Sequence, residues 1–142
     1  MSTTLAAAMA TIRGRWESEV EQALDLPTQY DARDLAEPEG EDARYCRLSI
    51  IPGDSAQVTA LCSPTGGQQF RTAGIFIASI YFPHGDGDGD QVALAEQAAG
   101  KFKAQTVGGV TFRTPSISRV GRAGKWWQVN VTCPWQFDTF SS

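Results

Sequence analysis

The stretch Phe70–Phe102, FRTAGIFIASIYFPHGDGDGDQVALAEQAAGKF, decides the fold of this chain of 142 residues. Its first part, 70–82, is rich in β-branched and aromatic residues, which predicts a long strand. Pro83 lacks the N–H that a ladder needs, so we expect the strand to end there. After a polar loop over 84–89, Asp90 is the expected N-cap of a helix that runs to Lys103.

The predicted strand is apolar on both of its faces. One set of side chains is Phe76, Ala78, Ile80 and Phe82, and the other is Ile75, Ile77 and Tyr81, interrupted by Ser79. A strand with one wet face alternates apolar with polar residues. We therefore expect the helices of this chain to cover one face and a partner subunit to cover the other.

A second helix is expected near the N-terminus, from Thr4 to about Leu24, with Pro27 ending it. Apolar residues recur there every three or four positions, which is the spacing of one helical face. They are Leu5, Met9, Ile12, Trp16, Val20 and Leu24.

The remaining segments predict short strands separated by turns. We expect strands at 29–32, 44–51, 56–62, 110–113, 116–120 and 125–133, with Pro52 and Pro134 as terminators and a basic turn at 121–124. Because strands and helices do not alternate strictly, the predicted class is α+β: a mainly antiparallel sheet with two helices packed on one face. The length and the lack of repeats or linkers predict a single domain, 1–142.

Composition excludes several classes of function. The net charge is −4, so the chain has no global attraction for nucleic acid or acidic membranes. No signal peptide or membrane span is evident. The cysteines Cys46, Cys62 and Cys133 form no CxxC pair, which predicts small buried hydrophobes in a reducing cytosol.

The acidic loop HGDGDGD at 84–90 invites a metal-binding interpretation. If Asp86 were position 1 of an EF-hand, position 6 would be Gln91 and position 12 would be Gln97, where the motif needs Gly and Glu. We therefore interpret the loop as a solvated turn whose acidic end favours the N-terminus of the next helix. His84 is the sole histidine and no nucleophile is placed near it, so we predict no catalytic residue, no metal and no cofactor.

Two features indicate a surface for a neighbouring subunit. Residues 113–125 are locally basic in an acidic chain, and an acidic surface at 37–42 or 86–90 of a neighbour would complement them. Trp126 lies on the polar face of the last strand, and an aromatic segment follows Pro134, although that segment could instead fold back into the chain's own core. The candidate interface residues are Ile75, Ile77, Arg119, Arg122, Trp126, Trp135, Phe137 and Phe140.

The order of these elements resembles the tail terminator-like proteins of long-tailed bacteriophages. The resemblance covers roughly residues 5–138 and rests on spacing rather than on one diagnostic motif. Its elements are an N-terminal helix, a strand ending in Y-x-P-x-G, a helix of the A-L-A-E type and a closing aromatic strand. The matching residues are Gly74, Ile75, Phe76, Tyr81, Pro83, Gly85, Ala93, Leu94, Ala95, Glu96, Phe102, Trp127, Val129 and Pro134.

The resemblance implies a structural protein of the virion and not an enzyme. Such proteins cap the tail tube as a ring, usually of six subunits, stop its elongation and present the surface to which the head attaches, while DNA passes through the lumen. The implied partners are other copies, the tail tube protein and a head–tail completion protein, after assembly in the host cytoplasm. Two alternatives to a tail terminator remain open. One is a neighbouring head–tail completion protein, and the other is a small module that binds a divalent metal at Asp86, Asp88 and Asp90.

Replacing Asp86 and Asp88 by Asn is expected to leave the melting temperature nearly unchanged, because exposed charges contribute little to stability. Asp90 is left intact, since an N-cap contributes about 0.5–2 kcal/mol. Thermal melting with and without a chelator measures the effect. A sharp fall in melting temperature on adding chelator would contradict the interpretation.

Overall fold

The computed structural model describes residues 4–24, 26–30, 44–57, 68–83, 88–123 and 126–141. Its described elements are α1 (Leu5–Trp16), η1 (Glu17–Glu21), β1 (Thr28–Tyr30), β2 (Tyr45–Gln57), β3 (Gln68–Pro83), α2 (Asp88–Gly100), β4 (Thr106–Val107), β5 (Val110–Phe112), β6 (Ser116–Ala123) and β7 (Trp126–Ser141). The predicted α+β class, with two helices and a large, mostly antiparallel sheet, is confirmed.

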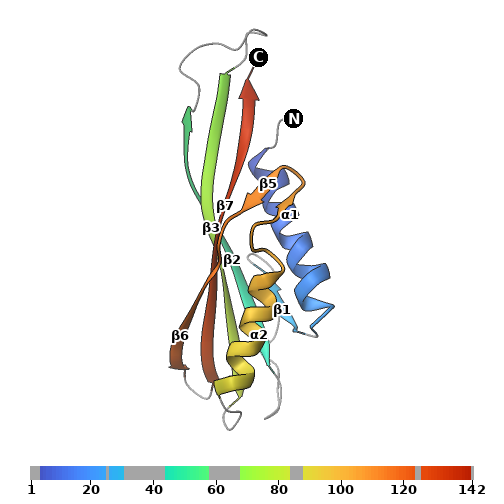
Figure 1. Ribbon diagram of the computed structural model, residues 1–142, viewed down its shortest axis with the longest axis vertical. Helices are drawn as coiled ribbons and strands as arrows, with labels where there is room; N and C mark the ends of the chain where they lie inside the picture. The colour runs from blue at the N-terminus through green and yellow to red at the C-terminus, as the bar shows by residue number, and fades with distance from the viewer. Residues whose placement is uncertain are drawn as a thin grey trace.

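The sheet is organised around β3. The strand order is β1-β2-β3-β7-β5-β4, and β6 pairs with β7 beside β5. Among the strand pairs that the structure describes, only β1–β2 is parallel. β3 pairs with β2 and with β7 over most of its length, so that Phe76 lies between Ile50 and Cys133. The strand predicted at 70–82 is therefore confirmed and extends to Gln68 and Pro83. Figure 1 shows these strands as the long spine of the molecule.

Two prolines that were expected to end strands lie inside them. β2 continues past Pro52 through a bulge and reaches Gln57. The first two residues of the separate strand expected at 56–62 therefore belong to β2. The rest of that expected strand, from 58 on, lies outside the described residues. β7 continues past Pro134 to Ser141. The aromatic segment is thus part of the sheet and not a separate tail.

The hydrogen-bond geometry explains why Pro134 is tolerated. In an antiparallel strand the N–H and C=O of one residue point to the same side. The carbonyl of Pro134 accepts a bond from the Arg113 N–H at 2.9 Å, so that side faces the junction of β5 and β6 and not β3. The missing N–H therefore costs the β3–β7 ladder nothing.

The β6 region also differs from expectation. Gly121, placed by the sequence in a basic turn at 121–124, belongs to β6 together with Ala123. The register shifts between Arg119 and Gly121, and Gly121 has φ +104°, which favours glycine. The bulge lets the strand continue where a turn was predicted.

The N-terminal helix begins as predicted. The Thr4 hydroxyl accepts a hydrogen bond from the Ala7 N–H at 3.1 Å, which satisfies one of the unpaired donors of the first turn. After Trp16 the helix widens into the π-helix η1, with the Gln22 N–H donating to the Glu17 carbonyl at 3.0 Å. The buried side is formed by Ala8, Ile12, Trp16 and Val20.

The second helix begins earlier than expected. α2 starts at Asp88 and ends at Gly100, so Asp90 lies in its first turn and is not the residue before it. The loop residues 84–87 lie outside the described residues. Turns follow at 101–104, and Phe102, the last member of the predicted stripe, is fully buried. Within the described ranges, no helix is both long and apolar enough to cross a membrane.

The core includes side chains from both helices and from the even-numbered side of β3. Trp16 from α1 meets the Phe76 ring edge-on at 6.1 Å and stacks with Phe102 at 5.9 Å, while Phe112 from β5 lies 5.0 Å from Phe102. Figure 1 draws α1 and α2 on the right-hand side of β3 and β7. Rings in such contact contribute about 0.5–1.5 kcal/mol per pair beyond their burial.

A polar network fixes η1 against the edge of the sheet. The Trp16 indole N–H donates to the Thr28 hydroxyl at 2.8 Å, and that hydroxyl donates to the Leu26 carbonyl at 3.1 Å. The Glu21 carboxylate accepts from the Thr28 N–H at 3.0 Å and from the Tyr30 hydroxyl at 3.4 Å. Burial and Glu21 together raise the pKa of Tyr30, so the phenol stays a donor.

Gly74→Ala is expected to destabilise the fold by about 1–3 kcal/mol, because an overpacked site forces its neighbours to move. A Cβ at Gly74 would lie 2.6 Å from the Ile51 carbonyl oxygen and 2.7 Å from the Trp135 ring. Chemical denaturation measures the change.

Gly14→Ala is the matched control, because no atom lies within 4 Å of the Cβ position at Gly14. It is expected to be neutral or to stabilise helix α1 by up to about 1 kcal/mol. Equal unfolding free energies for Gly74→Ala and the wild type would show that this close approach is not required.

Candidate subunit interface

The odd-numbered side of β3 differs from the side that forms the core. Phe76, Ala78, Ile80 and Phe82 are buried, whereas Ile75, Ile77, Ser79 and Tyr81 are only partly buried. The two predicted faces of this strand are therefore seen in the structure. The odd-numbered face is where surface remains for a partner.

An apolar patch lies in the middle of that face. Cross-strand pairing places Ile51 of β2, Ile75 of β3 and Pro134 of β7 in one row, and Ile77 follows in the next row between Ser49 and Thr132. We call Ile51, Ile75, Ile77 and Pro134 the isoleucine patch. Ile51 is 48% exposed, and the other three are partly exposed. Two of the predicted interface residues are thus brought together with two that the sequence analysis missed.

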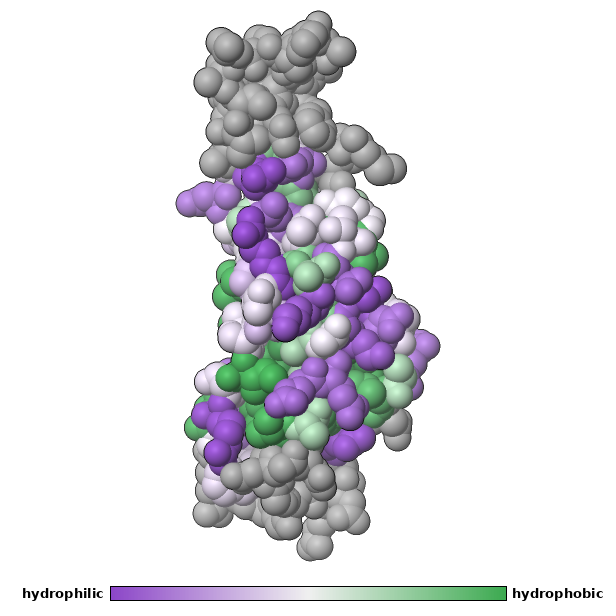
Figure 2. All heavy atoms as spheres, in the orientation of Figure 1, coloured by the Kyte–Doolittle hydropathy of each residue, from purple (hydrophilic) through white to green (hydrophobic). Residues whose placement is uncertain are grey.

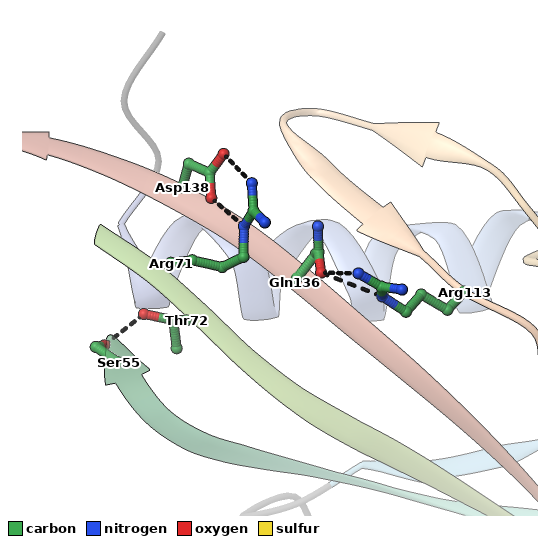
Figure 3. Close-up of polar contacts among 6 residues, drawn as sticks. All are labelled: Ser55, Arg71, Thr72, Arg113, Gln136 and Asp138. Carbon is green, nitrogen blue, oxygen red and sulfur yellow. Dashed lines mark hydrogen bonds and ion pairs between the residues drawn. The ribbon is translucent and has the colours of Figure 1, made fainter. Parts of the chain in front are cut away.

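Polar pairs border the patch toward the C-terminal end of β7, and Figure 3 shows their side chains. The Arg71 guanidinium donates to both carboxylate oxygens of Asp138, at 2.9 and 3.3 Å, and Arg113 donates to the Gln136 side-chain oxygen at 2.7 and 3.1 Å. Figure 3 shows both pairs in front of β7, with α1 behind it. Below the patch the same face carries Arg47, which donates to the Gln29 side-chain oxygen at 3.4 Å.

Aromatic side chains occupy the lower end of the same face. The Tyr45 and Tyr81 rings stack at 4.8 Å, and Trp126 meets Tyr45 edge-on at 5.2 Å. Trp126 is 6% exposed, so its own chain already covers it, although its face is the polar one predicted. The signal that the sequence analysis lacked is the register, which sets Tyr45 beside Tyr81.

The remaining predicted interface residues are dispersed. Trp135 and Phe137 are buried in the core, stacked on each other at 6.0 Å, so the alternative that this segment folds back is what the structure shows. Arg119 is exposed on β6. In the strand register, Arg122 lies opposite Trp127 and Phe140 lies opposite Gln69. The side chains of Arg122 and Phe140 lie outside the described part of the structure. An interface role for these residues stays a prediction.

Exposed hydrophobic side chains also occur near β6. Val120 is 52% exposed at the bulge, and Trp127 is 37% exposed on β7. Figure 2 shows hydrophobic residues at the surface in the lower half of the molecule, over the region where Figure 1 places α2, β6 and β7. This second apolar region lies apart from the isoleucine patch.

The titratable groups of the described residues include two buried thiols. No three His, Cys, Asp or Glu side chains gather there as a metal site. Cys46 and Cys133 are buried free thiols that form no disulfide. Burial raises the pKa of Cys133 to about 12 and that of Cys46 well above its usual value. Both thiols are thus neutral near pH 7, as small core residues. His84, Asp86 and Cys62 lie outside the described residues.

The described residues form a long sheet whose odd-numbered face carries an apolar patch bordered by arginine pairs. A profile of the phage tail terminator protein family matches residues 5–135, so the chain belongs to that family and is a structural protein of phage tails. One solved structure is 18% identical in sequence, with a TM-score of 0.60 over 91% of this chain and 94% of that one, which shows the fold alone. No curated protein matches the sequence significantly.

Trp126→Ala is expected to destabilise the monomer by about 3–5 kcal/mol, because it removes a buried aromatic side chain. The polar face of its strand had predicted Trp126 as an interface residue, but only 6% of the side chain is exposed. Trp127→Ala is the matched control and is expected to cost less, since 37% of Trp127 is already in water. Thermal melting of both variants compares them. A Trp126→Ala melting temperature equal to that of the wild type would mean that the aromatic cluster does not stabilise the fold.

Proposed function

We propose that this protein is the tail terminator itself: a ring, of six subunits, that caps the tail tube, stops its elongation and presents the surface for head joining. The observation that carries the proposal is the isoleucine patch, which is apolar and stays partly exposed in one chain. Membership of the terminator family supports the same role. The proposal treats residues 1–142 as one domain whose two helices cover one face of the sheet.

Ring closure places a physical demand on such a subunit. Each copy must offer two different surfaces, one to each neighbour, because an interface between like surfaces closes a dimer and stops. The odd-numbered face of the sheet and the helical side are different surfaces of this kind. Among the predicted interface residues, Ile75 and Ile77 support the use of the sheet face.

The proposed partners follow from the position at the head-proximal end of the tail. The ring would contact the tail tube protein on one side and a head–tail completion protein on the other, after assembly in the host cytoplasm. DNA passes through the lumen without specific binding, which agrees with a net charge of −4, since nucleic-acid affinity depends on contacts from basic residues to phosphates.

Tails assembled without this protein are expected to be abnormally long, because nothing then stops tube growth. Negative-stain images of tails made with and without a functional copy of the chain provide the length distribution. Supplying the wild-type chain in trans is the control and is expected to restore a single length.

A different outcome would favour the alternative role. Tails of normal length that fail to join heads would contradict the terminator proposal and indicate a head–tail completion protein. A metal-binding module would instead require that a chelator abolish the activity of the wild-type chain in the same assay.

A further inference from the structure

We propose that the isoleucine patch of one copy packs against the outer side of α1 and η1 of the next copy, with Arg47 pairing with Glu17 and Glu19 across the contact. The inference rests on the proposed function, since it assumes that identical copies assemble. It names the occupant of the patch as a second copy of this chain.

The open strand edges are poor alternatives for this contact. β1 and β4 are short edge strands, and β2 carries Pro52 and a bulge in its upper part. β6 carries a bulge and the exposed Arg119. Prolines, bulges and charges are the devices that keep edge strands from pairing with other chains. The face of the sheet around Ile51 offers exposed apolar side chains and does not depend on an unpaired strand edge, so it is the better contact surface.

The outer side of α1 is unusually apolar for a helix on the surface. Leu5 is 40% exposed, and the exposed positions Ala6, Ala7, Ala10 and Gly14 carry no polar side chain. A solvent-facing helical side normally carries charged or polar residues. The charged residues of α1 are Arg13 and Arg15 of its last turn, both of which are partly buried. Acidic residues follow in η1, where Glu17 is exposed and Glu19 is partly exposed. The fully exposed positions thus form an apolar part followed by an acidic part.

The charged groups that would meet, on η1 and at Arg47, lie at the same position along the strand direction, which we call their height. Glu21 of η1 accepts from the Thr28 N–H, and the next residue of β1, Gln29, pairs with Arg47. Arg47 alternates with the buried Cys46 and Leu48, so it lies on the opposite side of the sheet from the core. η1 and Arg47 therefore share one height on opposite sides of the chain.

The apolar part of α1 and the isoleucine patch also lie at the same height along the strands. Trp16, which ends α1, has its ring 6.1 Å from that of Phe76, and Phe76 is flanked in sequence by Ile75 and Ile77. The turn of α1 before Trp16, which carries Gly14, is thus level with the isoleucine patch. Rotation about an axis parallel to the strands preserves height, so it brings the patch to α1 and Arg47 to the acidic residues of the next copy.

The charges that would meet lack ion-pair partners within the described chain. Arg71 and Asp138 form the one salt bridge among the described residues, at 2.9 Å. Arg47 is exposed and donates only to a neutral amide, and neither Glu17 nor Glu19 is in an ion pair there. Complementary charges of this kind set the register and the partner of an interface.

Charge reversal tests the pairing. Arg47→Glu alone, and Glu17→Arg with Glu19→Arg alone, are each expected to lower the number of copies that co-purify with tails by roughly tenfold. The variant with all three changes is expected to return to within about threefold of the wild type, as coupled residues do. Lys103→Glu, another exposed charge reversal, is the matched control and is expected to have no effect.

A second variant tests the apolar part. Gly14 is exposed, and apart from its own helix backbone no described atom lies within 4 Å of a Cβ built there, so Gly14→Arg is expected to fold. The substitution places a long side chain where the neighbour's patch would sit. It is expected to keep the wild-type circular dichroism spectrum and to lose incorporation into tails.

The outcomes separate this inference from the proposed function. Incorporation of all the variants at the wild-type level, or failure of the triple variant to recover, would overturn the helix-to-sheet contact while tail-length control by the wild type still holds. Wild-type chain that neither co-purifies with tails nor changes their length would overturn the proposed function and this inference together.

Discussion

The backbone pairing of β3 with β2 and β7 is the constraint on which the rest of the structure depends. Buried N–H and C=O groups must find partners, and β3 obtains them from both neighbours over most of its length. Because of this requirement, β2 continues to pair with β3 beyond the bulge after Pro52, and β7 continues to pair with β3 beyond Pro134. The bulge and the proline are accommodated because neither breaks the pairing to β3 at its buried centre.

The two sides of this central strand have different roles. On the core side, Trp16, Phe76, Phe102 and Phe112 form a continuous aromatic cluster that joins α1, the segment after α2 and β5 to the sheet. The Trp16 indole is satisfied by Thr28, whereas the buried Trp135 indole N–H has no hydrogen-bond partner among the described residues. An unpaired buried donor is costly, so the packing around Trp135 must offset it.

On the other side the face is divided along its length. Tyr45, Tyr81 and Trp126 cover the lower end, the isoleucine patch lies in the middle, and the Arg71–Asp138 and Arg113–Gln136 pairs border the upper end. An apolar centre with a polar border is the usual arrangement of a protein–protein interface. In a protein of the tail terminator family, this arrangement is the reason for proposing the face as an assembly contact, on the same strand that organises the core.

The α+β class, the two helices and the two apolar faces of β3 could be predicted from the sequence, because they follow from local periodicity. The start of the N-terminal helix near Thr4, the N-cap of α1, and the burial of Cys46 and Cys133 could also be predicted. Only the tertiary structure decided what the prolines do, since Pro134 is harmless only when its nitrogen faces away from β3. Tertiary pairing likewise decided that Trp126, Trp135 and Phe137 are buried and that Ile51 joins Ile75 and Ile77, because register between distant strands determines which side chains meet and which remain exposed.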